Sequence, residues 1–318
     1  MFNLVITEAC PKGCTFCFTS TLARASDREM SVDTVNTILD NFSGDFSDVT
    51  VLGGEPTQHS KFQDVIKTIA DRGIHSNLVS NFLFNDDILD YIVANIQHFK
   101  WMLPNASELD RGDRMSIWKK NYERIYDAYS TSWGFEESPR LYLSFTIGED
   151  YEGMYDYIKW VLSQLPYKIK AVRIGLDLNG TYLVNNKQMG TELSRIMDML
   201  STNDIFVKDD CQIPPCLWEG DTESSVQFNA RGLATFKQAG DVSCGNAPID
   251  VFSDLSSIRC YPMQDRTNIK NVLEFDSVVK IVDTYETLYE GQRSEVPQDC
   301  KLCVFYPNQC NGICEGCL

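Results

Sequence analysis

Basic residues are scarce in this sequence of 318 residues: 28 lysines and arginines stand against 45 aspartates and glutamates, a formal net charge of −17. An acidic surface repels nucleic-acid phosphates and anionic lipid headgroups, so the composition argues against both kinds of partner. We therefore expect neither nucleic-acid nor membrane binding. A basic or neutral partner suits this charge better, although an acidic surface also simply keeps a protein soluble.

Long apolar runs are also lacking, and no stretch approaches the roughly 20 apolar residues that a membrane span requires. Met1 is followed at once by the strand-like run 2–6, without the zones of a secretory leader. We therefore expect a cytoplasmic protein that carries no N-terminal leader-peptide-binding domain. A chain of this length forms one large domain, or a domain of about 200 residues with a smaller appendage.

Histidine is rare, and none of His59, His75 and His98 has the spacing of a metal ligand. Cysteine is abundant but absent between Cys17 and Cys211. A reducing cytosol keeps few disulfides, so 12 cysteines in a chain without an export signal indicate metal ligation. They form an early group, Cys10, Cys14 and Cys17, and a late group: Cys211, Cys216, Cys244, Cys260, Cys300, Cys303, Cys310, Cys314 and Cys317.

Strand-like and helical patterns alternate over the first two thirds of the chain. Their order predicts an α/β fold, a partial (β/α)6 barrel of TIM-like form with parallel strands and crossover helices. In such sheets functional groups gather where strands end, and 10–17, 53–56 and Asn81 all follow strand ends. The expected strands are 2–6, 48–52, 74–79, 99–103, 141–147 and 171–178, and the expected helices 31–42, 62–71, 86–96, 117–129, 155–165 and 190–201.

The character of the chain changes near residue 204. Short strand-like pieces at 226–228 and 233–236, one helix near 277–289 and the late cysteines follow. A region so poor in regular structure requires cross-links for stability, and metal clusters can supply them. We therefore predict a core domain of residues 1–203 and a small cluster-binding domain of residues 204–318.

The early cysteines, spaced C-X3-C-X2-C, follow the first expected strand directly. Three thiolates can hold three irons of a four-iron cluster, which leaves the fourth iron open to a small molecule. A zinc site with a fourth ligand elsewhere is the alternative. The spacing, the preceding strand and Phe16 before the last cysteine resemble the signature of the radical S-adenosylmethionine (SAM) superfamily.

A second motif, Gly53-Gly54-Glu55-Pro56, follows the second expected strand and by itself reads as a turn. Paired glycines let backbone approach a ligand closely, and a carboxylate beside them suits an ammonium group. In this position the motif resembles the family's Gly-Gly-Glu-Pro, which contacts the SAM methionine amine. The resemblance implies SAM binding by Gly53, Gly54, Glu55 and Pro56, and makes Asn81, Ser144 or Thr146, and Arg173 candidates for the SAM ribose and carboxylate.

Each of these further candidates also has a purely structural alternative: Asn81 as a turn residue, Ser144 or Thr146 as a strand hydroxyl, and Arg173 as a surface guanidinium. The superfamily chelates the SAM amine and carboxylate at the open iron. One-electron reduction then yields methionine and a 5′-deoxyadenosyl radical that abstracts a hydrogen atom from the substrate. The resemblance therefore implies a [4Fe-4S] cluster, SAM and a low-potential electron donor such as flavodoxin or ferredoxin, while no catalytic acid or base is identified.

The late cysteines resemble the SPASM extension of such enzymes, which holds auxiliary [4Fe-4S] clusters. Two departures are visible: six residues rather than five separate Cys303 from Cys310, and Leu255 stands where the family usually has a glycine, five residues before Cys260. Structural zinc is the alternative. The resemblance implies one cluster on Cys300, Cys303, Cys310 and Cys317, and a second on Cys244, Cys260 and Cys314 completed by Cys211 or Cys216, or left with an open iron that binds substrate.

Family members with this extension most often act on peptides or proteins. The resemblance implies a ribosomal-peptide maturase that forms a crosslink or oxidises a side chain, with auxiliary clusters taking the electron left after hydrogen abstraction. One alternative is dehydrogenation of a small molecule such as an amino sugar, which the acidic charge suits equally. A second is an iron–sulfur carrier or zinc module without catalysis, against which the 53–56 motif argues, because a carrier has no use for a SAM amine site.

Overall fold

The computed structural model describes residues 2–14, 16–17, 28–109, 113–133, 140–148, 151–165, 169–176, 187–209, 248–259, 267–290 and 301. They belong to two compact units, Met1–Tyr142 with Gly245–Gln292, and Leu143–Cys244 with Arg293–Leu318. All nine late cysteines lie outside the described residues, as do the strand-like pieces expected at 226–228 and 233–236. The ligand sets proposed for the auxiliary clusters therefore stay predictions.

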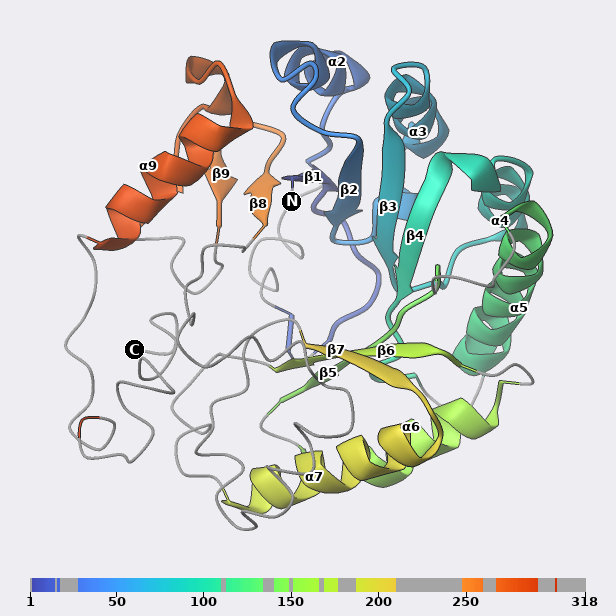
Figure 1. The fold of residues 1–318 in the computed structure, drawn as a ribbon. Coiled ribbons are helices and arrows are strands. Elements are labelled where there is room, and N and C mark those ends of the chain that lie inside the picture. Colours follow the sequence, from blue (N-terminus) through green and yellow to red (C-terminus); the bar gives the residue numbers. More distant parts are fainter. Residues whose placement is uncertain are drawn as a thin grey trace. The chain divides into compact units, whose positions relative to one another are not determined.

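The first unit is built on a sheet of parallel strands, drawn in blue to green in Figure 1. Helices on the outer side of this curved sheet connect its strands (Figure 1). The α/β class with parallel strands and crossover helices is thereby confirmed. The strands β1 (Phe2–Thr7), β2 (Asp48–Gly53), β3 (His75–Ser80) and β4 (Phe99–Pro104) pair in that order, with α2 (Val32–Asn41), α3 (Phe62–Ala70), α4 (Asp86–Ala94) and α5 (Asp113–Trp133) along the chain, and the short 3-10 turns η1 (Pro56–Gln58) and η2 (Ile96–His98).

Local sequence accounts for these elements. All six residues of β1 are buried, as expected for a central parallel strand covered on both faces. Helix α2 begins after Ser31, whose hydroxyl accepts a hydrogen bond from the Thr34 amide at 3.0 Å, and it buries its apolar stripe. Asn85 caps α4 in the same way through the Ile88 amide, at 3.0 Å. In the part of the chain that the structure describes, no helix is long and apolar enough to cross a membrane.

A hairpin from the far end of the sequence completes this sheet. β8 (Ile249–Val251) pairs parallel with β1, β9 (Ser257–Ile258) pairs antiparallel with β8, and β10 (Asn268–Ile269) pairs with β9. Val5, Phe252 and Ile258 pack into a small apolar cluster. The turn η7 (Val272–Glu274) and helix α9 (Val278–Glu290) follow.

The second unit carries its own parallel sheet, in the order β5 (Leu143–Ile147), β6 (Ala171–Leu176) and β7 (Phe206–Asp209), with α6 (Met154–Ser163) and α7 (Lys187–Thr202) along the chain. Strand β7 was not expected from the sequence. It adds to β6, while β8 adds to β1, so segments beyond residue 203 share sheets with earlier strands. The domain boundary at 203/204 stays a prediction.

The hairpin turn between β8 and β9 places a non-glycine residue in a left-handed conformation. Leu255 has a left-handed backbone with φ of 67°, and its amide donates to the Phe252 carbonyl at 3.0 Å. A turn followed by a left-handed residue is a common hairpin connection that favours glycine at the left-handed position. Leu255 therefore adopts a backbone conformation that glycine adopts more readily.

Substituting Leu255 tests this strain. We expect Leu255→Gly to change the free energy of unfolding by less than about 1 kcal/mol, because relief of left-handed strain offsets the extra backbone entropy of glycine. Leu255→Val is expected to cost about 1 to 3 kcal/mol, since a β-branched residue tolerates positive φ poorly. Urea denaturation of the two variants measures the difference, and equal stability of the two would contradict the strain.

Candidate functional site

The cysteine loop is held at its base by backbone pairing on both sides. On one side, the Gly54 amide donates to the Thr7 carbonyl and the Glu55 amide to the Ala9 carbonyl, both at 2.8 Å. On the other side, the Glu8 amide donates to the Arg28 carbonyl at 3.0 Å, and the two side chains form an ion pair at 3.1 Å. The chain segments at residues 8 and 28 are therefore held side by side by hydrogen bonding and an ion pair.

The two glycines of the 53–56 motif are required by the closeness of these backbones. A Cβ atom added at Gly53 would lie 2.2 Å from the Thr7 carbonyl oxygen, and one at Gly54 2.3 Å from the Ala9 carbonyl oxygen. Gly53 also has a positive φ of 153°. The contacted atoms belong to backbone that cannot rotate aside, so only glycine fits at both positions. The motif thus packs against the chain segment that delivers Cys10.

The early cysteines form no disulfide bond and are of intermediate exposure. The Cys17 amide donates to the Cys14 carbonyl at 3.3 Å, and the Cys10 sulfur contacts the Lys12 carbonyl oxygen at 3.6 Å. Burial raises the pKa of Cys14 to about 11 and also raises that of Cys10. Thiolates at these positions therefore require a compensating positive charge, such as a metal centre provides.

Lys12, inside the cysteine motif, is buried, with only 7% of its surface exposed. Its ammonium donates to the Ser107 carbonyl oxygen, in the loop after β4. That loop is itself ordered: the Ser107 amide donates to the Asn105 side chain at 2.9 Å, and the Asn105 amide to the Ser80 carbonyl at 2.8 Å. Burial lowers the pKa of Lys12. The cysteine loop is thus tied to the ends of β3 and β4, which the sequence did not indicate.

Glu55 connects the ends of β2 and β3. Its carboxylate is 2% exposed, and one oxygen accepts from the Thr57 amide at 3.2 Å, the Thr57 hydroxyl at 2.6 Å and the Ser80 hydroxyl at 2.8 Å. The other oxygen accepts from the Asn81 amide at 2.7 Å. Burial raises the pKa of Glu55, while these hydrogen bonds oppose the rise. Four protein donors therefore fix this carboxylate, a role that the sequence did not reveal.

Asn81 carries a donor without a partner. Its Oδ1 accepts from the Leu83 amide at 2.8 Å, while its Nδ2 has no hydrogen-bond partner although the residue is only 8% exposed. Buried polar groups are nearly always hydrogen-bonded, so an orphaned amide marks a place where a polar ligand fits. It lies at the end of β3, where the backbone of Asn81 already bonds Glu55.

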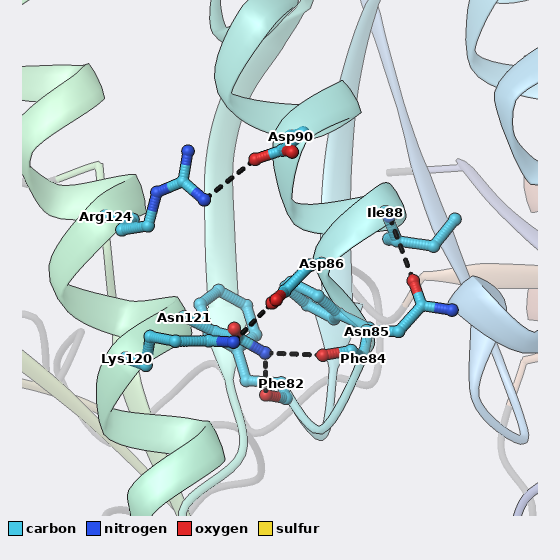
Figure 2. Close-up of polar contacts among 9 residues, drawn as sticks. All are labelled: Phe82, Phe84, Asn85, Asp86, Ile88, Asp90, Lys120, Asn121 and Arg124. Carbon is cyan, nitrogen blue, oxygen red and sulfur yellow. Dashed lines mark hydrogen bonds and ion pairs between the residues drawn. The ribbon is translucent and has the colours of Figure 1, made fainter.

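Helix α5 braces the loop that follows Asn81 (Figure 2). Phe82 has a left-handed φ of 59°, and the buried Asn121 of α5 donates from Nδ2 to the carbonyls of both Phe82 and Phe84, at 2.9 Å each. Ion pairs of Lys120 with Asp86, and of Arg124 with Asp90 at 2.8 Å, join α5 to α4 (Figure 2). Asn121 was not identified from the sequence, where its only signal is a polar residue on the buried face of a helix.

The sequence was compared with models of known protein families. Residues 4–130 match the family model described as the radical SAM superfamily. This chain contains a radical SAM domain. The resemblance expected from the cysteine spacing and the 53–56 motif is thereby confirmed, whereas the SPASM-like extension beyond it stays a prediction.

Solved structures of SuiB from Streptococcus suis share the fold. The structure of SuiB bound to S-adenosylmethionine is 15% identical with a TM-score of 0.61, covering 98% of this chain and 72% of that chain. The structure of SuiB bound to precursor peptide SuiA is 14% identical with a TM-score of 0.62, covering 98% and 71%. At such identities the likeness establishes the fold alone. A search of curated proteins found no match to this chain.

The cysteine loop of the radical SAM domain offers three thiols, the number that a [4Fe-4S] cluster with one open iron takes. Among the described residues, no three His, Cys, Asp or Glu side chains are gathered to hold a metal ion. A [4Fe-4S] cluster is wider than a single ion, and three thiolates can bind three of its four irons. A tetrahedral zinc site requires a fourth ligand close to the thiols, and the geometry supplies none within the described residues. Cys10, Cys14 and Cys17 are therefore the residues that would hold the cluster.

The structure also shows the hydrogen-bond partners of Arg173, Ser144 and His59. Arg173 on β6 donates to the Ser144 hydroxyl of β5 at 2.9 Å, so these two predicted residues lie together in the second unit, with Thr146 two residues along β5. His59 bonds the Met30 carbonyl through Nε2 and the Lys61 amide through Nδ1, both at 2.9 Å. Both ring nitrogens of His59 are therefore engaged by backbone groups.

Proposed function

We propose that this protein is a radical SAM enzyme that oxidatively modifies a peptide by hydrogen-atom abstraction. A [4Fe-4S] cluster on Cys10, Cys14 and Cys17 supplies, when bound, the electron that cleaves SAM into methionine and the 5′-deoxyadenosyl radical that takes the substrate hydrogen. The observation that carries the proposal is the hydrogen-bonded junction of the cysteine loop with Gly54, Glu55 and Asn81 at the ends of three adjacent parallel strands.

Different residues hold the cysteine loop and the 53–56 turn in position. Gly53 and Gly54 bring the β2 turn against the backbone before Cys10, and Lys12 anchors the same loop to Ser107. Glu55 fixes the turn relative to Asn81. In this proposal the unpaired Nδ2 of Asn81 donates to SAM, and the motif at 53–56 offers backbone to the methionine amine. Ser144 and Arg173 are proposed to bind SAM as well.

Two observations support the proposal of a peptide substrate. SuiB, whose fold is similar, was solved bound to a precursor peptide, and the net charge of −17 suits a basic peptide. Dehydrogenation of an amino sugar is the alternative, which the same charge would suit. The proposal includes a cytoplasmic location, a flavodoxin or ferredoxin as electron donor, and one or two auxiliary clusters on the late cysteines.

Anaerobic reconstitution with iron and sulfide, followed by reduction in the presence of SAM, tests the proposal. The wild-type protein is expected to form 5′-deoxyadenosine and to hold about eight irons with one auxiliary cluster or about twelve with two, against about four if only the first cluster exists. Cys14→Ala is expected to form none. Absence of 5′-deoxyadenosine from the wild type would refute the enzyme, and its formation by Cys14→Ala would refute the ligand assignment. A short peptide encoded beside this gene that accelerates the reaction would separate peptide from amino-sugar substrates.

Asn81→Ser isolates the orphaned amide. A serine hydroxyl can still accept the Leu83 amide hydrogen bond, so the turn is retained while Nδ2 is lost. We expect about tenfold weaker SAM binding, equivalent to one lost hydrogen bond of about 1.4 kcal/mol, with unchanged iron content. Isothermal titration with SAM measures the affinity. The control is Asn85→Ala, which removes the α4 cap and lowers stability by about 1 kcal/mol without changing SAM affinity.

A further inference from the structure

The buried amide of Asn121, on α5, holds two carbonyl groups of the loop that carries Asn81. Its Nδ2 donates to the carbonyls of Phe82 and Phe84, at 2.9 Å each (Figure 2). Asn121 is fully buried, and its Oδ1 has no hydrogen-bond partner. The reverse orientation of the amide would set an oxygen against two carbonyl oxygens, so the donors face the loop. The hydrogen bonds of this side chain are therefore directed at the loop after β3.

One peptide unit connects Asn121 with Asn81. The Phe82 carbonyl and the Leu83 amide belong to the same peptide unit, which is planar and rigid. Its carbonyl accepts from Asn121, and its N–H donates to Oδ1 of Asn81 at 2.8 Å. The orientation of this unit therefore determines where Oδ1 of Asn81 lies, and with it the unpaired Nδ2 of the same side chain.

The backbone on one side of this peptide unit is strained. Phe82 has a left-handed φ of 59°, a conformation that costs free energy for any residue with a Cβ atom. Its amide donates to the Ser80 hydroxyl at 3.0 Å, which fixes the preceding peptide unit, while Asn121 holds the following one. Without Asn121, rotation of the following unit would relieve the strain and withdraw the Leu83 amide from Asn81.

We propose that Asn121 is a positioning residue for SAM, acting through the peptide unit between Phe82 and Leu83 and through Asn81. The inference rests on the proposed function and deepens it, by naming a residue on a helix behind the loop that sets the affinity for SAM. Because Asn121 acts through Asn81, its removal can weaken SAM binding by no more than loss of the Asn81 amide does. A purely structural role predicts lower stability with unchanged affinity.

Asn121→Leu removes both donors from a side chain of similar size. We expect about fivefold to tenfold weaker SAM binding, up to the loss expected for Asn81→Ser, with unchanged iron content. Asn121→Gln keeps both N–H donors and is expected to retain most of the wild-type affinity. The matched control is Tyr129→Phe, on the same helix. It removes the buried hydrogen bond from the Tyr129 hydroxyl to the Phe99 carbonyl, at 3.3 Å, and lowers stability without changing SAM affinity.

The experiment is isothermal titration of the anaerobically reconstituted full chain with SAM, with the melting temperature and iron content of each variant measured alongside. The decisive comparison is the double variant Asn81→Ser/Asn121→Leu. We expect it to bind SAM as tightly as Asn81→Ser does, because the two residues act in series and their effects are not additive.

A loss of affinity in Asn121→Leu that neither Asn121→Gln nor Tyr129→Phe shows, and that disappears in the Asn81→Ser background, supports the proposal. Wild-type affinity in Asn121→Leu overturns it, and so does a double variant that binds about fivefold to tenfold more weakly than Asn81→Ser. Equal losses in Asn121→Leu and Asn121→Gln also overturn it, because packing rather than hydrogen bonding would then matter.

Two further results are assigned in advance. If Asn121→Leu does not fold, Asn121→Ser takes its place under the same criteria, since one hydroxyl cannot donate to both carbonyls. A wild type that binds no SAM would refute the proposed function and this inference together, whereas a wild type that binds SAM no more tightly than Asn121→Leu refutes the inference alone.

Discussion

Alanine at position 54 is expected to prevent loading of the SAM-binding cluster. The added Cβ atom would lie 2.3 Å from the carbonyl oxygen of Ala9 and 2.6 Å from that of Glu8, and neither backbone group can turn away. The β2 turn and the cysteine loop must therefore separate, with loss of the 2.8 Å hydrogen bonds to the Thr7 and Ala9 carbonyls. Overpacking and two lost bonds together cost about 3 to 5 kcal/mol.

Urea denaturation and iron counting measure this effect. The matched control is Gly175→Ala, in the interior of β6, where the nearest atom to an added Cβ is a flexible Arg173 nitrogen at 3.7 Å. That variant is expected to stay within about 1 kcal/mol of the wild type and to load the same iron. Wild-type stability and iron content in Gly54→Ala would show that the two backbones are not in contact.

Much of the first unit followed from periodicity. The apolar run of β1 and the helical spacing of α2 and α3 predicted these elements to within a residue or two, and Ser31 was recognised as a cap. The strands beyond residue 204 were missed because they have two to four residues each, too few to show a period of two. The pairing of β8 with β1 joins opposite ends of the chain, which no local pattern encodes.

The residues of the site also fall into two groups. Some belong to contiguous sequence motifs, and others make contacts between positions far apart in the sequence. The thiol spacing and the 53–56 motif are contiguous, and they were sufficient to identify the radical SAM domain. The contacts of Lys12 with Ser107 and of Asn121 with Phe82 join residues far apart in sequence. For Glu55, residue chemistry suggested an ammonium ligand, and the proposed SAM contact still stands. The structure adds four hydrogen bonds to the same carboxylate, one of them from Ser80 at the end of β3 and one from Asn81, which follows it.

Glu55→Gln is expected to destabilise the protein by about 1 to 3 kcal/mol and to loosen the SAM site. One carboxylate oxygen faces the Thr57 amide and the other faces the Asn81 amide. A glutamine NH2 group cannot accept a hydrogen bond, so in either orientation of the side chain one buried backbone N–H loses its acceptor. Urea denaturation measures the cost. The control is Glu29→Gln, a more exposed carboxylate that accepts from the Ser60 amide at 2.7 Å, for which the loss is smaller.

The two glutamates also differ in the sign of their pH dependence. Burial raises the pKa of Glu55 despite its hydrogen bonds, so the folded state holds this proton more tightly than the unfolded chain. The resulting stability is complete below about pH 4.3, the ordinary glutamate value, and is lost as the pH rises through the raised pKa. Glutamine has no such proton, so the deficit of Glu55→Gln narrows with rising pH. At Glu29, burial is outweighed by the Ser60 hydrogen bonds and the pKa is lowered, so the deficit of Glu29→Gln widens with rising pH. Parallel trends in the two variants would show that burial does not govern the ionisation of Glu55.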